Sequence, residues 1–252
     1  MKINTAKRRM LAGEPAIGAG VGLGSTLACE LLSLAGFDFL LIDNQHGGWD
    51  DASSLAAFRS TSLGSAVPMA RVRQNDFGAI GRLLDAGALG IVVPMVHSAE
   101  DAKRAVFATR FPPLGGRSCG PFGTDFYGSD YLQWCDREIF LAIQIESQRA
   151  VEHAEEIMSV EGIDGCWAGP ADLALSMGVD LTTAAGFEAH EAALLSVVQA
   201  CRNTGKIPGI ATGGDEADRR VAQGFQFVTA GGDRTYLLDG ARRILRKMGR
   251  LD

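Results

Sequence analysis

Eight short, continuous apolar runs recur along the chain, and a helix-like stretch separates most of them from the next. Such runs are typical of strands that are buried on both faces of a parallel sheet. The expected strands are Ala16–Val21, Phe39–Asp43, Val67–Val72, Gly90–Met95, Phe140–Glu146, Gly162–Ala168, Ile207–Ala211 and Phe225–Ala230. Strand–helix alternation on this scale, over 252 residues, predicts a (β/α)8 TIM barrel.

The segments between these runs carry apolar residues at helical spacing, and several end at a glycine of the kind that caps helices. The expected helices are Thr26–Ala35, Phe77–Gly87, Ala99–Thr109, Arg149–Ser159, Phe187–Asn203 and Glu216–Gln223. An open doubly wound sheet is the competing arrangement. The barrel is favoured because polar residues follow strands all along the chain rather than at one switch point. Without a linker or low-complexity segment, residues 1–252 are expected to form a single domain.

Composition and charge exclude several classes of protein. The net charge is −6, and no basic patch suggests binding to nucleic acid. No run approaches the roughly 20 apolar residues of a membrane span, and the N-terminus lacks a signal-peptide core. The five cysteines are scattered and contain no C-x-x-C pair, which favours free thiols in a reducing, cytoplasmic environment.

Two carboxylates end neighbouring strands of the expected barrel. Glu146 closes the fifth run, and Asp172 follows the sixth in Gly169-Pro170-Ala171-Asp172. The carboxyl ends of barrel strands meet at one face, where active sites are built. Carboxylates without clustered cysteines or several converging histidines suit a hard divalent ion such as Mg²⁺ or Mn²⁺. We therefore expect a metal site formed by Glu146 and Asp172.

Candidate groups for proton transfer and charge stabilisation follow the second and third strands. His46 comes three residues after Asp43, and a carboxylate near an imidazole orients it and supports its protonated form. Arg71 ends the third strand, where its cation could stabilise an oxyanion or bind a carboxylate. His97, after the fourth strand, is the alternative acid/base.

Lysine placement argues against a Schiff-base aldolase, which needs a lysine inside the barrel. Lys206 precedes the seventh strand, so it lies at the opposite end from the site. None of the others is well placed either: Lys2, Lys7, Lys103 and Lys247. The turn at 169–172 could offer backbone N–H groups to an anion. Gly-Gly pairs after the seventh and eighth strands could hold phosphate, but ordinary turns are the favoured explanation.

These residues together resemble the metal-dependent class II pyruvate aldolases, the family of 4-hydroxy-2-oxoheptanedioate and 2-dehydro-3-deoxyglucarate aldolases. The resemblance covers nearly the whole chain. The motifs that carry it are Leu41-Ile42-Asp43-Asn44-Gln45-His46, Arg71 with Asn75-Asp76, Val93-Pro94-Met95-Val96, Arg110-Phe111-Pro112-Pro113, Gln144-Ile145-Glu146, Gly169-Pro170-Ala171-Asp172-Leu173 and Gly205-Lys206-Ile207-Pro208-Gly209.

The resemblance implies a role for each matching residue. Glu146 and Asp172 would hold a divalent ion (Mg²⁺, Mn²⁺ or Co²⁺), with Gln144 beside it. His46, paired with Asp43, would be the acid/base, and Arg71 would contact the oxo group of pyruvate or its enolate. Backbone amides in the turn from Gly169 to Asp172, which also contains Pro170 and Ala171, would bind the substrate carboxylate. Asp85 would reach the site of a neighbouring subunit in a homohexamer that exchanges C-terminal helices.

The implied reaction is the reversible addition of pyruvate, or a related 2-oxo acid such as hydroxypyruvate, to an aldehyde. Gln45 departs from the family, which usually has Glu before the catalytic His, and this change affects the expected substrate range and pH optimum. Two alternatives stay open: a lyase or mutase acting on phosphoenolpyruvate or an acyl-CoA, and a non-catalytic barrel that binds a 2-oxo acid. The long connection from His97 to Glu138, helical only in its first part, is expected to form a lid or a subunit contact.

Overall fold

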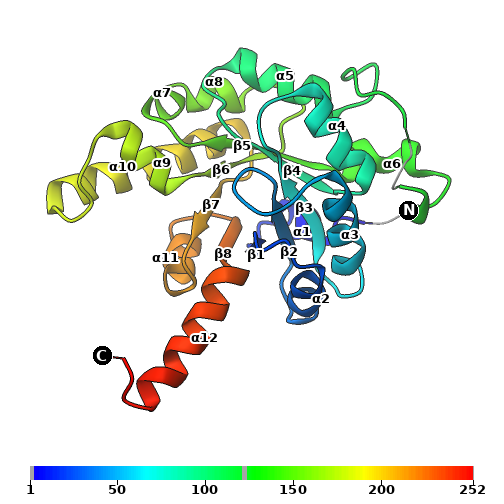
Figure 1. Ribbon diagram of the computed structural model, residues 1–252. Coiled ribbons are helices and arrows are strands. Elements are labelled where there is room, and N and C mark those ends of the chain that lie inside the picture. The colour runs from blue at the N-terminus through cyan, green and yellow to red at the C-terminus, as the bar shows by residue number, and fades with distance from the viewer. Residues whose placement is uncertain (1–2, 121–123, 252) are drawn as a thin grey trace.

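The chain folds into a closed barrel of eight parallel strands, in which each strand pairs with the next and β8 pairs with β1 (Figure 1). The computed structural model describes residues 3–120 and 124–251. The strands are β1 Ala16–Val21, β2 Phe39–Asp43, β3 Val67–Arg71, β4 Gly90–Val93, β5 Phe140–Ile145, β6 Gly165–Ala168, β7 Gly209–Thr212 and β8 Phe227–Gly232. The barrel prediction is confirmed, and the open doubly wound sheet is wrong.

Helices surround the barrel. They are α1 Thr5–Leu11, α2 Thr26–Leu34, α3 Asp51–Thr61, α4 Phe77–Ala86, α5 Ala99–Thr109, α6 Tyr131–Glu138, α7 Gln148–Glu152, α8 Ala154–Met158, α9 Pro170–Met177, α10 Ala184–Thr204, α11 Ala217–Ala222 and α12 Asp233–Lys247, with 3-10 turns Asp125–Tyr127 and Gly214–Glu216. The sequence analysis did not anticipate α1, α3, α6 or α9. It expected α7 and α8 as one helix, which the structure interrupts at His153.

Aromatic side chains from three strands fill the lower part of the barrel. Phe227 lies 4.5 Å from Phe39 and 4.9 Å from Phe140, measured between ring centroids. Gly18 makes room for this cluster, since a Cβ there would lie 2.4 Å from the Phe39 ring. These rings fill the barrel near the amino ends of their strands, and the carboxyl ends are where barrel enzymes build their sites.

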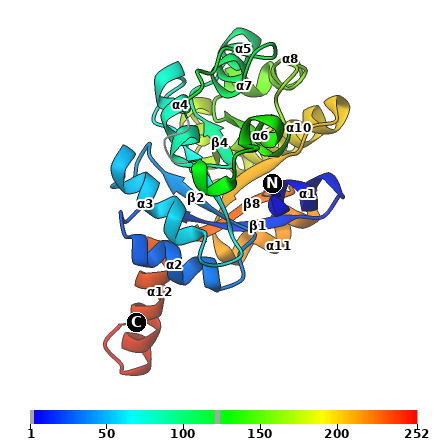
Figure 2. The same cartoon turned by 90° about the vertical axis from the view of Figure 1, so that its right-hand side faces the viewer.

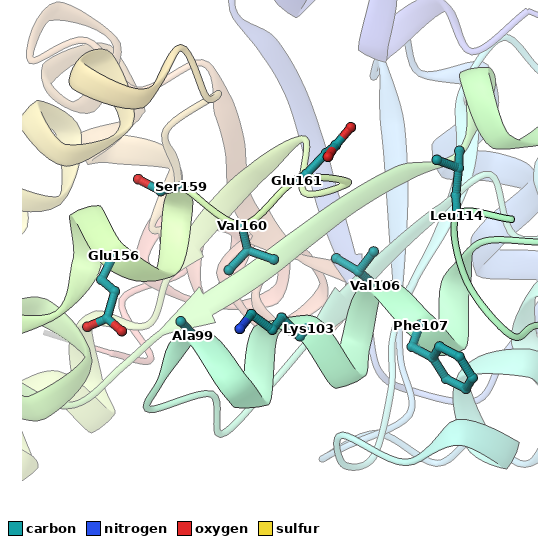
Figure 3. Close-up of a pocket in the computed structure, with 9 residues that line it drawn as sticks. All are labelled: Ala99, Lys103, Val106, Phe107, Leu114, Glu156, Ser159, Val160 and Glu161. Atoms are coloured by element: carbon teal, nitrogen blue, oxygen red, sulfur yellow. The ribbon is translucent and has the colours of Figure 1, made fainter.

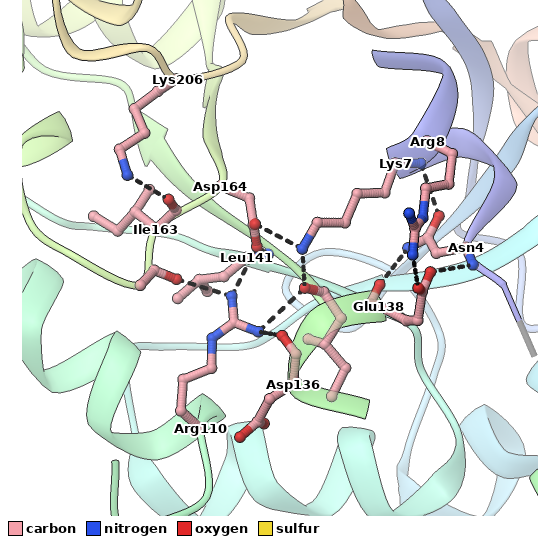
Figure 4. A network of polar contacts seen from close by, with 12 residues as sticks. Asn4, Lys7, Arg8, Arg110, Asp136, Glu138, Leu141, Ile163, Asp164 and Lys206 are labelled. Atoms are coloured by element: carbon pink, nitrogen blue, oxygen red, sulfur yellow. Dashed lines mark hydrogen bonds and ion pairs between the residues drawn. The ribbon is translucent and has the colours of Figure 1, made fainter. Parts of the chain in front are cut away.

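A buried polar network closes the opposite end of the barrel (Figure 4). Lys7 on α1 lies 2.7 Å from Asp164, which precedes β6, and Arg110 lies 2.8 Å from the same carboxylate. Lys7 Nζ also donates to the carbonyl of Ile139 at 3.0 Å. Burial lowers the pKa of Lys7, and the charge of Asp164 opposes this effect. Lys7 therefore lies at the end of the barrel that contributes to stability rather than to catalysis. Lys206 lies at the same end, where its Nζ donates to the carbonyl of Ile163 at 2.8 Å.

Replacing Asp164 with Asn should destabilise the protein by about 3 kcal/mol, because two buried cations lose their shared carboxylate. Activity measured below the melting temperature should persist, because Asp164 lies at the opposite end of the barrel from Asp43, Arg71 and Glu146. Thermal unfolding would measure the effect. Asp51→Asn is the control, because it breaks an exposed pair with Arg82 that contributes little. Equal melting temperatures for the two variants would contradict this account.

The long connection after β4 packs beneath the barrel rather than above it. Arg117 Nη2 donates to Asp85 in the last turn of α4 at 2.8 Å, and Tyr127 Oη donates to the carbonyl of Gly87. Helix α4 follows the carboxyl end of β3 at the top of the barrel and runs back toward the start of β4. Its last turn therefore lies at the lower side. The prediction of a lid is therefore wrong for the chain's own site, and α6 makes the end of the connection helical as well. Residues 121–123 of this segment lie outside the described residues.

Helix α12 projects away from the barrel, as both ribbon views show (Figures 1 and 2). It exposes an apolar stripe made of Leu237, Ile244, Leu245 and Met248. Helix α2 exposes a second stripe on its outer face, made of Leu23, Leu27, Leu31 and Leu34 just before and along the helix. Within the described residues, no helix has both the length and the apolar character needed to cross a membrane.

Candidate active site

Glu146 stands at the upper end of β5 and is almost completely buried, with 3% of its surface exposed. Its Oε1 accepts a hydrogen bond from the backbone N–H of Met95 at 2.8 Å, and its Oε2 accepts one from Nε2 of Gln144. Met95 presents its amide there in a left-handed conformation (φ 58°). Strand β4 ends at Val93, directly before Pro94 and two residues earlier than expected. Two neighbouring elements therefore hold this carboxylate in one orientation.

The electrostatic surroundings of Glu146 favour its neutral form. Burial raises its pKa, and the nearby carboxylate of Asp172 raises it further, while the amide of Met95 and the charge of Arg71 act in the opposite direction. Asp172 itself is exposed, but two neighbouring carboxylates repel one another unless a proton or a cation lies between them.

Asp172 lies in the first turn of α9, directly after β6. Gly169 joins strand and helix where a side chain would be crowded, because a Cβ there would lie 3.0 Å from Cβ of Glu146 and 3.1 Å from Nε2 of Gln144. The N–H of Gly169 already donates to Ile145 at 3.0 Å, and Pro170 has no N–H. Gly169 and Pro170 therefore have no free amide to offer a carboxylate. Ala171 and Asp172 keep first-turn amides that have no partner within the helix.

These residues fit a hard divalent cation. Glu146 and Asp172 bring two carboxylates together, and Oε1 of Gln144 is buried without a hydrogen-bond partner among the described residues. A cation would relieve the repulsion of the carboxylates and accept the unpaired amide oxygen. Across residues 3–120 and 124–251, no cluster of three or more His, Cys, Asp or Glu forms a metal site. Any ion held here would keep coordination positions for water or substrate.

Asp43 and Arg71 form a two-point ion pair at the ends of β2 and β3. Arg71 Nε donates to Oδ1 at 2.9 Å, and Nη2 donates to Oδ2 at 2.5 Å. Burial would raise the pKa of Asp43, but the hydrogen bonds and charge of Arg71 hold it below its ordinary value. The register of the barrel places these residues directly opposite one another.

His46 lies on the exposed loop after β2. Asp43 accepts the backbone N–H of His46 at 3.2 Å and that of Gln45 at 3.0 Å, so it orients the loop. Among the described contacts, the carboxylate pairs with Arg71 and not with the imidazole, so the structure does not bring together the expected Asp43–His46 side-chain pair. His97, the alternative acid/base, is held by Ser147 Oγ, 2.9 Å from its Nδ1.

A cavity of about 220 Å³ opens at the top of the barrel beside these groups. Its wall is built by Gly20, Leu41, Asp43, Arg71, Trp167, Ala211, Thr212, Thr229 and Gly231. Glu146 is not part of this wall, but it lies close enough for the charge of Arg71 to act on it. The volume equals that of about seven waters, which suits a molecule of a few carbons.

The sequence analysis assigned no role to Trp167 or Thr229. The guanidinium carbon of Arg71 lies 5.2 Å from the centre of the Trp167 ring, and Trp167 Nε1 donates to Thr229 Oγ1 at 3.0 Å. The face of the Trp167 ring thus contacts the guanidinium of Arg71, and Thr229 fixes the indole. The alternation of side chains along β6 and β8 could have indicated that both face the barrel interior.

Larger cavities lie in the helical layer, away from the strand ends. One of about 580 Å³ separates α5 from α8 (Figure 3), and another of about 610 Å³ lies on the other side of α5. Lys103 lines both, is 64% exposed, and pairs with Glu100 at 3.7 Å. Neither cavity contains an expected site residue, so the smaller one at the strand ends is the candidate active site.

Asp85 is remote from the site of its own barrel. It lies within the last turn of α4, at the lower side, where its carboxylate is held by Arg117. The protomer alone therefore does not bring Asp85 together with His46, Arg71 or Glu146.

A closed parallel barrel with acidic and basic groups at the carboxyl ends of its strands is the architecture of a barrel enzyme. Residues 22–239 match the model of the HpcH/HpaI aldolase/citrate lyase family. The chain is 35% identical to a 4-hydroxy-2-oxo-heptane-1,7-dioate aldolase of Escherichia coli, over 98% of this chain and 95% of that protein.

Solved structures agree with this relationship. An HpcH/HpaI aldolase/citrate lyase family protein from Burkholderia cenocepacia J2315 superposes with a TM-score of 0.88 at 32% identity, covering 97% of this chain and 99% of that one. An HpcH/HpaI aldolase from Desulfitobacterium hafniense DCB-2 gives 0.87 at 26% identity, covering 98% and 97%. This chain belongs to the HpcH/HpaI aldolase/citrate lyase family. It is an aldolase, a lyase that makes and breaks carbon–carbon bonds.

Proposed function

We propose that this chain is a divalent-metal-dependent aldolase that adds pyruvate, or a related 2-oxo acid such as hydroxypyruvate, reversibly to an aldehyde. The products in the synthetic direction are 4-hydroxy-2-oxo acids. The observation that carries the proposal is the meeting of Glu146 and Asp172 beside the Asp43–Arg71 pair at the mouth of a small cavity. Membership of the aldolase family and the name of the E. coli relative support the same reaction.

Glu146 and Asp172 would hold the ion, with the free amide oxygen of Gln144 beside it. When bound, a divalent ion supplies Lewis-acid polarisation of the oxo group, which lowers the cost of removing a proton from the adjacent carbon. Mg²⁺, Mn²⁺ and Co²⁺ all suit this oxygen-rich donor set. The first-turn amides of Ala171 and Asp172 would bind the carboxylate of the 2-oxo acid at the positive end of α9.

His46 would move the protons. In the cleavage direction it removes the proton of the 4-hydroxyl group, and in the synthetic direction it returns a proton to the aldehyde oxygen. Asp43 would act by positioning, because it holds the loop amide of His46 and fixes the guanidinium of Arg71. Arg71 would place its charge where the enolate oxygen develops.

Proton exchange between pyruvate and deuterated water tests this function, because the step needs no aldehyde. The wild-type enzyme should catalyse it, and Arg71→Ala should slow exchange and aldol addition equally, by about 10²–10³-fold, since one stabilising donor is lost. The Michaelis constant should change little, because the contact forms only as charge develops.

Arg71→Lys is the matched variant: it keeps the charge but loses the two-point contact with Asp43, so it should recover only part of the rate. Normal exchange with impaired aldol addition would instead place Arg71 at the aldehyde. Failure of the wild-type enzyme to exchange pyruvate would favour the alternative reading, a lyase or mutase acting on phosphoenolpyruvate or an acyl-CoA.

We also propose that residues 1–252 form one barrel domain and that six copies assemble by exchanging α12. The apolar stripe of α12 and that of α2 are both exposed in the single protomer, so each could cover the other across a subunit boundary. In such an assembly Asp85 would reach the site of a neighbour, with Arg117 as its anchor. The five free cysteines accord with a cytoplasmic location.

Light scattering coupled to size exclusion should therefore report a hexamer. Leu31→Asp should dissociate it into smaller species, because a charge would be buried in the middle of the α2 stripe. Leu181→Asp, at an exposed leucine before α10, is the control and should leave the assembly intact. A fully active wild-type monomer at assay concentration would exclude both the exchange and a role for Asp85 in a neighbouring site.

A further inference from the structure

An indole ring lines the active-site cavity and links strands that do not pair with one another. Trp167 comes from β6, and only 5% of its surface is exposed. Its Nε1 donates to Oγ1 of Thr229 on β8 at 3.0 Å. The centre of its ring lies 5.2 Å from the guanidinium carbon of Arg71, which comes from β3. Trp167 therefore connects a hydroxyl on one side of the barrel to a cation on the other.

The ion pair with Asp43 fixes the guanidinium of Arg71 only in part. Nε and Nη2 donate to the two oxygens of one carboxylate, an arrangement that favours a common plane for both groups. The carboxylate itself turns about a soft terminal torsion, so the pair can tilt as a unit. A flat ring against the guanidinium opposes this tilt by packing and by attraction between the cation and the ring face. This attraction is strengthened because the Arg71 side chain is only 11% exposed.

One nitrogen of Arg71 is left for a ligand. Nη1 makes no hydrogen bond among the described residues, whereas Nε and Nη2 both donate to Asp43. All the N–H groups of a guanidinium lie in one plane, so the tilt of that plane decides where the Nη1 protons point. Arg71 and Trp167 line the same cavity. The contact with the ring therefore controls the direction of the one donor that Arg71 can offer to a substrate there.

The plane of the Trp167 ring depends in turn on Thr229. An indole also turns about a broad terminal torsion, and its N–H is its only hydrogen-bonding group. The bond from Nε1 to Oγ1 of Thr229 selects one orientation of the ring. Thr229 is itself buried, with 5% of its surface exposed, so loss of its hydroxyl would leave the indole N–H unpaired.

We propose that Trp167 and Thr229 are positioning residues for Arg71. The Thr229 hydroxyl sets the plane of the indole, and the indole holds the guanidinium so that Nη1 faces the oxo group of the 2-oxo acid. This proposal rests on the proposed function, in which Arg71 places its charge where the enolate oxygen develops. Neither side chain takes part in the bonds that change, and each acts through Arg71.

A double-mutant cycle on pyruvate proton exchange in deuterated water tests the proposal without an aldehyde. Thr229→Val and Trp167→Phe remove the same hydrogen bond, so each should lower the kcat of exchange about fivefold, and the double variant should be no slower than either alone. The KM for pyruvate should change little, because the contact acts as charge develops. Thr229→Ser, which keeps the hydroxyl, should restore the rate. Trp167→Leu, which also removes the aromatic face, should be about fivefold slower again.

Fluorine NMR of the metal-free protein labelled with 5-fluorotryptophan gives a readout that does not depend on activity. The Trp167 signal is the one that Trp167→Phe removes, and it should shift in Thr229→Val and in Arg71→Lys. Trp134→Phe is the matched control, because it changes a buried tryptophan of α6 whose Nε1 donates to Asp130 at 3.3 Å, away from the cavity wall. It should leave exchange unchanged.

Rates are referred to the folded fraction of each variant, measured by circular dichroism at the assay temperature. Wild-type exchange by folded Trp167→Leu would overturn the proposal, as would a Trp167 signal that Thr229→Val leaves in place. Effects of Thr229→Val and Trp167→Phe that multiply in the double variant would also overturn it, because Thr229 would then contact the substrate directly. In each case the wild-type enzyme still exchanges pyruvate. Absence of wild-type exchange rejects the pyruvate aldolase itself, and the positioning role with it.

Discussion

Removal of divalent cations with a chelator should lower the aldolase rate by about a thousandfold or more, and Mg²⁺ or Mn²⁺ should restore it. The loss follows because a bound cation contributes several kcal/mol of charge stabilisation at the reacting oxo group. Glu146→Gln and Asp172→Asn should reproduce the loss and abolish Mn²⁺ binding in calorimetry. The fold should survive Glu146→Gln, since an amide oxygen can still accept the N–H of Met95.

Glu161→Gln is the matched control, because it removes an exposed carboxylate beyond α8 and should leave both metal binding and rate unchanged. Borohydride reduction in the presence of pyruvate should leave the protein mass unaltered. A covalent adduct after that treatment would contradict the metal-dependent mechanism, because it would reveal a Schiff base on a lysine.

Replacing His46 with Ala should lower turnover by about 10²–10⁴-fold, the usual contribution of a positioned acid/base. Pyruvate should still bind the metal-loaded variant, because the expected donor-binding groups lie elsewhere: Glu146 directly after β5, Asp172 on α9 and Arg71 on β3. Steady-state rates in both directions, together with a pyruvate titration followed by Mn²⁺ relaxation, would separate the two effects.

His97→Ala is the control for His46. Its ring is tied to Ser147 and is not part of the cavity wall, so the variant should keep most of its turnover. If His97→Ala lost turnover and His46→Ala kept it, the acid/base role would pass to His97.

Much of the barrel could be predicted from local pattern, because each strand is buried on both faces and must be a continuous apolar run. The expected bounds of β1 and β2 agree with the structure, and the other strands differ by one to three residues at one or both ends. The observed strand ends differ from the expected ones where the local backbone conformation departs from what the pattern of apolar residues predicts. Strand β4 stops at Val93 because Pro94 has no N–H for the ladder, and Met95 then adopts a positive φ and donates its N–H to Glu146. Helix α3 was missed because its apolar face is weak, with small and polar residues through most of its length.

Pairing between side chains was less predictable than their placement. The sequence analysis put Asp43 with His46, three residues away, but the barrel register sets it against Arg71 on the next strand. The same contact explains why Asp43 is charged yet largely buried. Trp167 and Thr229 went unnoticed for a related reason, because their contact joins β6 to β8 across the interior.

By itself, the sequence determined that eight parallel strands form, that Glu146, Asp172, Arg71 and His46 follow strand ends, and which family of aldolases the motifs resemble. These properties depend on short-range periodicity and on the order of residues along the chain. Only the tertiary structure decided which groups meet. In the closed barrel, Glu146 lies beside Asp172, and Arg71 forms an ion pair with Asp43. Asp85 lies at the opposite end, where it pairs with Arg117. Such contacts depend on register and on the geometry of closure, which residues far apart in the chain establish together.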